Sequence, residues 1–181
     1  MVLDVQNISV AEFDEWVHHP ENIEQNYEYI RGEIVEVVSN SKSSKISSIL
    51  GGFIAVHVHK NDLGHTTGAD GGYQVGDERY IPDAGFISKA RMPEFEDASY
   101  LSIAPDLAVE VVSPTDSQRL ITVKVANYLT AGTTVWLVYP DEKEIEVYAP
   151  KMAVVKLTED DELDGGDLLP DFKLSLKTLF K

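Results

Sequence analysis

The sequence predicts a mixed α/β fold in which a mixed β-sheet is flanked by helices. Short segments rich in Val, Ile and Tyr alternate with two longer segments whose apolar residues recur at helical spacing. The chain has 181 residues, of which 43% are hydrophobic, and this is enough to bury the core of one domain. Since no Pro/Gly/Ser-rich linker divides the sequence, we expect a single domain over residues 1–181.

The first half of the chain predicts two helices and two pairs of strands. Residues 10–20 are expected to form a short helix that ends near Pro20. Residues 27–38 predict two strands joined by a turn at Arg31-Gly32. Residues 43–60 predict a long helix, weakened by Gly51-Gly52. Strands are expected within 64–75 and 79–88.

The second half predicts one helix between strands. Residues 106–113 predict a strand, and residues 116–131 give the clearest helical pattern of the chain. Ser113 or Thr115 can cap this helix and Gly132 can end it. The remaining strands are expected at 133–139, 144–149 and 153–158.

Charge and composition exclude several classes of protein. Without cysteine the chain has no disulfide, no thiol nucleophile and no Cys-ligated metal. The net charge is −16 and sits mainly in residues 1–40 and 141–171, whereas the centre is nearly balanced. No apolar run approaches the roughly 18 residues of a membrane helix. Met1–Asp4 lacks the basic region of a signal peptide, so we expect a cytoplasmic protein with no membrane partner.

Two carboxylates lie at the start of a predicted strand segment or within one. Asp83 follows Pro82 and opens the strand segment AGFIS, and Glu110 lies in the middle of the apolar segment LAVEVVS. Because side chains alternate along a strand, Glu110 shares a face with Ala108, and a buried carboxylate there needs a cation or a hydrogen-bond network. Together the two acids could coordinate one Mg²⁺ or Mn²⁺, with oxygens within about 4–6 Å of each other. The alternatives are an edge strand for Glu110 and an ordinary turn residue for Asp83.

Lys124, on the predicted helix 116–131, is the candidate positive charge next to Asp83 and Glu110. It lies on the stripe Leu120–Lys124–Tyr128, beside the apolar residue Ile121. If the helix packs across the sheet, the ammonium should lie within about 3–5 Å of a Glu110 or Asp83 oxygen. The alternative is that the lysine extends along the apolar surface into solvent.

Several segments resemble one protein family. Pro82-Asp83, PDLAVEVVSP at 105–114 and KVANYLTAGTTVWLVYP at 124–140 resemble the Uma-two (Uma2) family, as do YEYIRGEIVE at 27–36 and GDLLPDFKL at 166–174. These bacterial proteins are regarded as endonucleases of the PD-(D/E)xK, restriction-endonuclease-like class. The resemblance covers nearly the whole chain. It implies a nuclease-type core, with Asp83 and Glu110 as metal ligands and Glu28 as a possible auxiliary ligand.

The lysine departs from the nuclease signature. In that signature a lysine follows the acid by two residues, where this chain has Val112. The family usually places a lysine on the following helix, and Lys124 matches that position.

These observations lead to two hypotheses about function. The first is a Mg²⁺- or Mn²⁺-dependent endonuclease that hydrolyses phosphodiesters, with DNA as substrate, Asp83 and Glu110 as metal ligands and Lys124 and Glu28 assisting. The second is an inactive member of the same fold that serves as a binding or assembly module, and the acidic charge favours it. Convergence of the basic side chains around Asp83 and Glu110 would favour the nuclease; they are Lys42, Lys45, Lys60, Arg79, Lys89, Arg91 and Arg119.

A homodimer is also expected. Trp136–Tyr139 form a nearly continuous apolar strand, which predicts burial on both faces. The hairpin near 144–149 would then lie toward an edge of the sheet, where a second copy could add.

Overall fold

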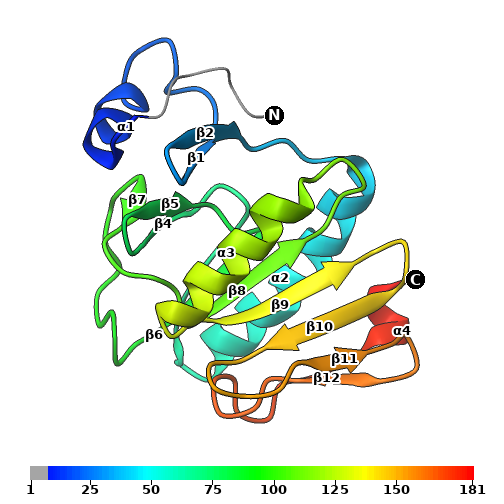
Figure 1. Cartoon of the computed structure of the whole chain (residues 1–181). Helices are drawn as coiled ribbons and strands as arrows, with labels where there is room; N and C mark the ends of the chain where they lie inside the picture. The colour runs from blue at the N-terminus through cyan, green and yellow to red at the C-terminus, as the bar shows by residue number, and fades with distance from the viewer. Residues whose placement is uncertain (1–7) are drawn as a thin grey trace.

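A computed structural model of the chain describes residues 8–181, and its strands form two larger sheets and a hairpin (Figure 1). The residues before Ile8, on which the signal-peptide expectation rests, lie outside the described part. The five-stranded sheet has the order β2 (Glu33–Glu36), β1 (Tyr27–Ile30), β5 (Glu78–Tyr80), β4 (Gly72–Val75) and β7 (Tyr100–Leu101). The six-stranded sheet has the order β11 (Val155–Leu157), β10 (Glu144–Tyr148), β9 (Thr134–Tyr139), β8 (Leu107–Val111), β6 (Ala84–Ser88) and β3 (Gly64–Thr67). The hairpin pairs β12 (Glu162–Asp164) with β13 (Lys173–Ser175).

Helices cover both faces of the six-stranded sheet. Figure 1 shows α3 (Gln118–Thr130) in front of this sheet and α2 (Ser41–Lys60) behind it. α1 (Val10–Trp16) lies beside the smaller sheet, and α4 (Leu176–Leu179) follows β13. β8 and β9 are parallel, whereas β6 and β8 are antiparallel. The expected class, a mixed sheet flanked by helices, is therefore confirmed, although the strands divide between sheets.

The alternation along β8 directs its side chains to two different hydrophobic clusters. Leu107, Val109 and Val111 pack in the cluster that includes α2 residues such as Leu50. Ala108 packs in the other cluster, with Tyr128 of α3. Glu110 shares the face of Ala108, so its carboxylate points toward α3.

Local sequence explains the ends of several elements. Arg31 and Gly32 both have positive φ, which is the conformation of a two-residue hairpin turn, and they join β1 to β2 at the expected place. Gly132, with φ of +90°, follows the end of α3 as expected.

Other expected boundaries are wrong. α1 ends at Trp16, with Val17 as C-cap, and turns occupy the residues up to Pro20. α2 begins at Ser41, because Asn40 accepts hydrogen bonds from the N–H groups of Lys42 and Ser43. The N-cap of α3 is Ser117, not Ser113 or Thr115.

The apolar strand at the centre of the sheet is buried as expected. Trp136, Leu137 and Val138 of β9 are each at most 2% exposed, between neighbours β8 and β10. β10, which covers most of 144–149, is not itself an edge, since β11 pairs with its other side. The dimer therefore stays a prediction, and the free edge on that side belongs to β11. Among residues 8–181 no helix has the length and apolar character needed to cross a membrane.

Candidate active site

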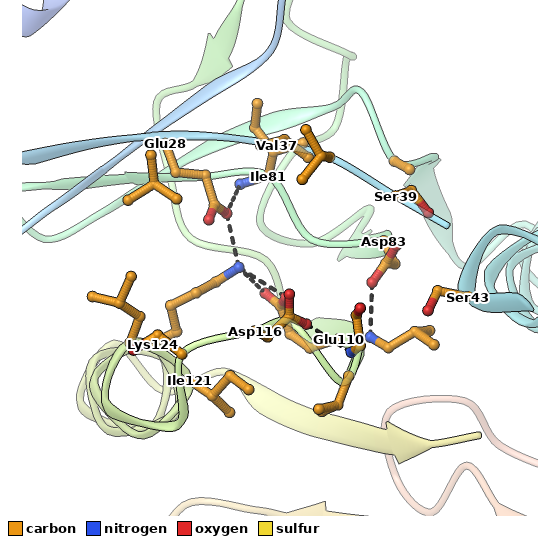
Figure 2. Close-up of a pocket in the computed structure, with 18 of the residues that line it drawn as sticks. Glu28, Val37, Ser39, Ser43, Ile81, Asp83, Glu110, Asp116, Ile121 and Lys124 are labelled. Atoms are coloured by element: carbon orange, nitrogen blue, oxygen red, sulfur yellow. Dashed lines mark hydrogen bonds and ion pairs between the residues drawn. The ribbon is translucent and has the colours of Figure 1, made fainter. Parts of the chain in front are cut away.

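The four candidate residues line one cavity at the junction of the two larger sheets. Glu28 comes from β1 of the smaller sheet and Glu110 from β8 of the larger one. Asp83 lies in the segment that leads from β5 to β6, and Lys124 lies on α3. The cavity measures about 390 Å³. Figure 2 shows the lysine side chain extending from α3 toward the carboxylates of Glu28 and Glu110.

Lys124 joins two carboxylates from different sheets. Its Nζ donates to Glu28 Oε1 at 2.8 Å and lies 2.8 Å from both carboxylate oxygens of Glu110. The lysine side chain is 10% exposed. The expected contact between Lys124 and Glu110 is confirmed, and a lysine that extends into solvent is excluded. The role of this contact in catalysis stays a prediction.

Further hydrogen bonds fix the two glutamates. The Ile81 N–H donates to Glu28 Oε1 at 2.7 Å. The hydroxyl of Tyr128, one turn after Lys124 on α3, donates to Glu110 Oε1 at 3.0 Å. Tyr128 is fully buried, and burial together with the nearby Glu110 raises the pKa of its hydroxyl well above the usual range. The hydroxyl therefore remains a hydrogen-bond donor to the carboxylate.

Asp83 is held by the strand that carries Glu110. Its Oδ2 accepts the N–H of Val111 at 2.7 Å, which ties the entry of β6 to the end of β8. β8 lies between β6 and β9, so the edge-strand alternative for Glu110 is excluded. Both acids line the same cavity, although the expected spacing of about 4–6 Å for one shared cation stays a prediction.

Burial and neighbouring charges shift the pKa values of the groups in this cluster. Burial raises the pKa of Asp83 to about 6, although the Val111 N–H and Lys124 act in the opposite direction. Burial also raises the pKa of Glu110 to about 8, with Glu28 and Asp83 adding to the effect and Lys124 opposing it. For Lys124, burial lowers the pKa, but Glu110 and Glu28 outweigh it, so the net pKa is raised and the ammonium stays charged.

The donor set fits a hard divalent cation. With all groups ionised, three carboxylates and one ammonium give this cluster a net charge of −2, which one divalent ion would balance. Carboxylate oxygens are the ligands that Mg²⁺ and Mn²⁺ prefer. Among the described residues, however, no three Asp, Glu or His side chains lie close enough together to hold an ion by themselves. An ion held by Asp83 and Glu110 would therefore take its other ligands from water or substrate, because Glu28 is engaged by Lys124 and Ile81.

The other basic side chains do not converge on the carboxylates. Among all lysines and arginines, every one of which lies in residues 8–181, only Lys124 lines the cavity. Of the seven basic side chains that the nuclease hypothesis would bring to the site, five form ion pairs with acids elsewhere, and Lys45 contacts a C-terminal oxygen of Lys181. The pairs are Lys42–Asp141, Arg79–Asp14, Lys89–Asp62, Arg91–Asp106 and Arg119–Glu33. This arrangement is the one that favours the binding-module hypothesis.

Sequence reasoning did not find three of these contacts. It placed Tyr128 on the same stripe as Lys124 but gave it no partner, and the one-turn spacing was the available signal. It named Glu28 only through a family resemblance and did not foresee the ion pair with Lys124. No sequence signal could have identified the Ile81 N–H as a partner of Glu28.

Comparisons with known proteins agree with the fold. The profile of the Uma2 family, described as "Putative restriction endonuclease", matches residues 10–177. A crystal structure from Anabaena variabilis, described as a "putative nuclease belonging to DUF820", superposes with a TM-score of 0.84. The two chains are 29% identical, and the alignment covers 96% of this chain and 97% of the other. A comparison with curated proteins gives no match.

Proposed function

The chain belongs to the Uma2 family, and from that premise we propose that it is a metal-dependent endonuclease that hydrolyses phosphodiester bonds, with DNA as substrate. The observation that carries the proposal is the Lys124 ammonium, 2.8 Å from Glu28 and Glu110 in the cavity that Asp83 also lines. Carboxylates that carry excess negative charge can hold a divalent cation, and a buried lysine beside them can bind a phosphate oxygen.

Asp83 and Glu110 would hold the divalent cation. The cation supplies charge that stabilises the transition state and lowers the pKa of water. Asp83 is oriented by the Val111 N–H, and Glu110 is oriented by Tyr128 and Lys124. Because these partners are buried, both carboxylates would keep their positions as substrate enters.

Lys124 would position the attacking water and the reacting phosphate. An ammonium has three N–H donors, and Nζ lies 2.8 Å from one oxygen of Glu28 and from both oxygens of Glu110. If Glu110 keeps only one of its two contacts, the N–H that is released can donate to water or to a phosphate oxygen. Hydrolysis then forms one bond between the water oxygen and phosphorus and breaks one bridging P–O bond. The water loses a proton to solvent, and the leaving alkoxide gains one.

Glu28 would act through Lys124. Its Oε1 accepts from both Lys124 and the Ile81 N–H, so it fixes the lysine from the side opposite to Glu110 (Figure 2). We therefore assign Glu28 a positioning role and not a primary ligand role.

The direct test is metal-dependent cleavage of labelled DNA. The purified protein is expected to cleave in Mg²⁺ or Mn²⁺ and not in EDTA, and Lys124→Met should lower kcat/KM by about 100-fold or more. Asp83→Asn and Glu110→Gln should abolish cleavage, whereas Asp160→Asn, on a remote exposed pair with Lys177, should not. Cleavage that persists unchanged in Asp83→Asn would refute the assignment and indicate a contaminating nuclease.

The second candidate function is an inactive binding module of the same fold. The observation in its favour is the dispersal of the basic side chains, five of which are paired with acids away from the cavity. Isothermal titration with Mn²⁺ separates the two. A module without a cation site should give no heat that depends on Asp83, whereas the nuclease should bind Mn²⁺ and lose binding in Asp83→Ala.

A further inference from the structure

Aliphatic side chains from two elements form two walls of the cavity, whereas other parts of its lining, such as Asn26 and Ser39, are polar. One wall comes from β2 and the segment after it, with Val35, Val37 and Val38. The facing wall comes from α3, with Ile121 and Val125. In the view of Figure 2, Val37 and Ile121 lie on opposite sides of the carboxylate cluster. The walls thus form an apolar slot whose floor is charged.

The outer end of this slot is open to solvent. Val38 is 62% exposed, one of the most exposed large hydrophobic side chains among the described residues. Ile121 is half-buried, although it follows the buried Leu120 directly and lies one turn before the buried Val125 along α3. Apolar side chains left accessible beside a polar floor are typical of a site that takes a partly apolar ligand.

The rim of the cavity offers almost no positive charge. Of the three basic residues besides Lys124 that adjoin lining residues in the sequence, Lys42 is paired with Asp141 and Arg119 with Glu33, and the third, Arg31, does not line the cavity. Asp116 and Glu36 line the cavity as well, and the chain as a whole carries −16. A protein that binds duplex DNA neutralises several phosphates with lysine and arginine side chains. This site has one ammonium for the reacting phosphate and none for its neighbours.

We propose that the substrate enters this cavity as an unpaired nucleotide, whose base lies between the aliphatic walls while its phosphodiester meets the carboxylates and Lys124. The proposal rests on the proposed function and specifies its substrate class. A cavity of about 390 Å³ lies in the range of small-ligand sites, and its lining holds no cation besides Lys124 that could bind the flanking phosphates of a double helix. A base that is already unpaired also avoids the cost of extrusion from a duplex. Aliphatic contact with a base face requires no particular base, so little sequence preference is expected.

The test compares three forms of one end-labelled DNA strand: single-stranded, fully paired, and paired with a complement that leaves a bulge. With Mn²⁺ present, the single strand and the bulge should be cut at least about tenfold faster than the full duplex. Between about 50 and 200 mM salt, cleavage of the single strand should fall by no more than about threefold, as for a single phosphate contact.

Two wall variants test the slot itself. Val38→Ser and Ile121→Ala should raise KM for the single strand about five- to tenfold with little change in kcat, because they remove contacts with the base and leave the charged floor intact. The control is Val155→Ser, a 48% exposed position on the edge strand β11, which should change neither constant. Circular dichroism confirms that each variant is folded.

The possible outcomes separate this inference from the proposed function. Duplex cleavage as fast as single-strand cleavage, or wall variants without effect on KM, would overturn the unpaired-nucleotide inference while leaving the nuclease assignment in place. Absence of any Asp83-dependent cleavage of all three substrates would overturn the proposed function, and this inference with it.

Discussion

Replacing Asp83 by Asn removes an ionisable group whose burial destabilises the metal-free protein. Burial raises the Asp83 pKa from its ordinary value of 3.8 to about 6. The difference between these two values corresponds to about 3 kcal/mol of unfolding free energy. Asn retains an oxygen that can accept the Val111 N–H, so the hydrogen bond at 2.7 Å need not be lost. We therefore expect Asp83→Asn to stabilise the protein by about 2–3 kcal/mol in EDTA at about pH 8.

The sign of the pH dependence follows from the raised pKa. The folded state binds the Asp83 proton more tightly than the unfolded state. The contribution of this proton to the stability of the wild type is therefore full below about pH 4 and is lost as pH rises through about 6. The advantage of Asp83→Asn should therefore be full above about pH 7 and should disappear near pH 4. In a chain of this size, the gain corresponds to a rise in Tm of about 5–10 °C.

Urea unfolding followed by circular dichroism, at several pH values with EDTA, measures this effect. Asp160→Asn serves as the control, since its pair with Lys177 is exposed to solvent and should contribute little to stability at any pH. A gain in Asp83→Asn that is independent of pH, or a loss at pH 8, would refute the argument that an ionised, desolvated Asp83 is the cause.

Three further predictions concern the lysine, the tyrosine and the cation. Lys124→Met leaves Glu28 and Glu110 buried without a cation and should lower the unfolding free energy by about 3–5 kcal/mol near pH 8, and by less near pH 5, as urea titration would measure. Adding Val112→Lys in that background rebuilds the lysine of the nuclease signature and should restore part of the stability and cleavage; no recovery of either would contradict this. Tyr128→Phe removes a donor to Glu110 and should cost about 1–2 kcal/mol by the same method, and an unchanged stability would show that the bond contributes nothing. Mn²⁺ at about 100 times its Kd should stabilise the wild type by about 2.7 kcal/mol in thermal unfolding, and an equal shift in Glu110→Ala would place the ion elsewhere.

The orientation of Glu110 could be predicted from sequence because it depends on local geometry. Side chains alternate along a strand, so the apolar run around Glu110 fixed which neighbours share its face. The helical stripe that carries Lys124 follows from the same kind of regularity. The contact between Lys124 and Glu110 then requires only that α3 pack back on the strand that precedes it, which is the usual arrangement in this type of unit.

The division into two sheets and the contacts of Glu28 could not be predicted in this way. The ion pair between Glu28 and Lys124 joins residues 96 positions apart in the sequence, on a strand of one sheet and a helix that covers the other. Local periodicity contains no information on which strands become neighbours across such a distance. The N-cap of α3 differs from the expected one for a local reason. Asp116 accepts the N–H of Ser113 and forms a turn of its own, which delays the start of the helix to Gln118.

The position of the lysine on α3 ties assembly of the site to assembly of the fold. A lysine at position 112 would directly follow β8, two residues after Glu110, and the two would stay close whenever that strand is formed. Lys124 instead depends on the packing of α3, through Leu120, Val125 and Tyr128, against the sheet. Because the ammonium also holds Glu28, it connects both larger sheets to the helix through one buried charge. Local unfolding of α3 would therefore remove the Lys124 ammonium from both carboxylates at once. Any loss of helix packing should then reduce cleavage before the rest of the chain unfolds.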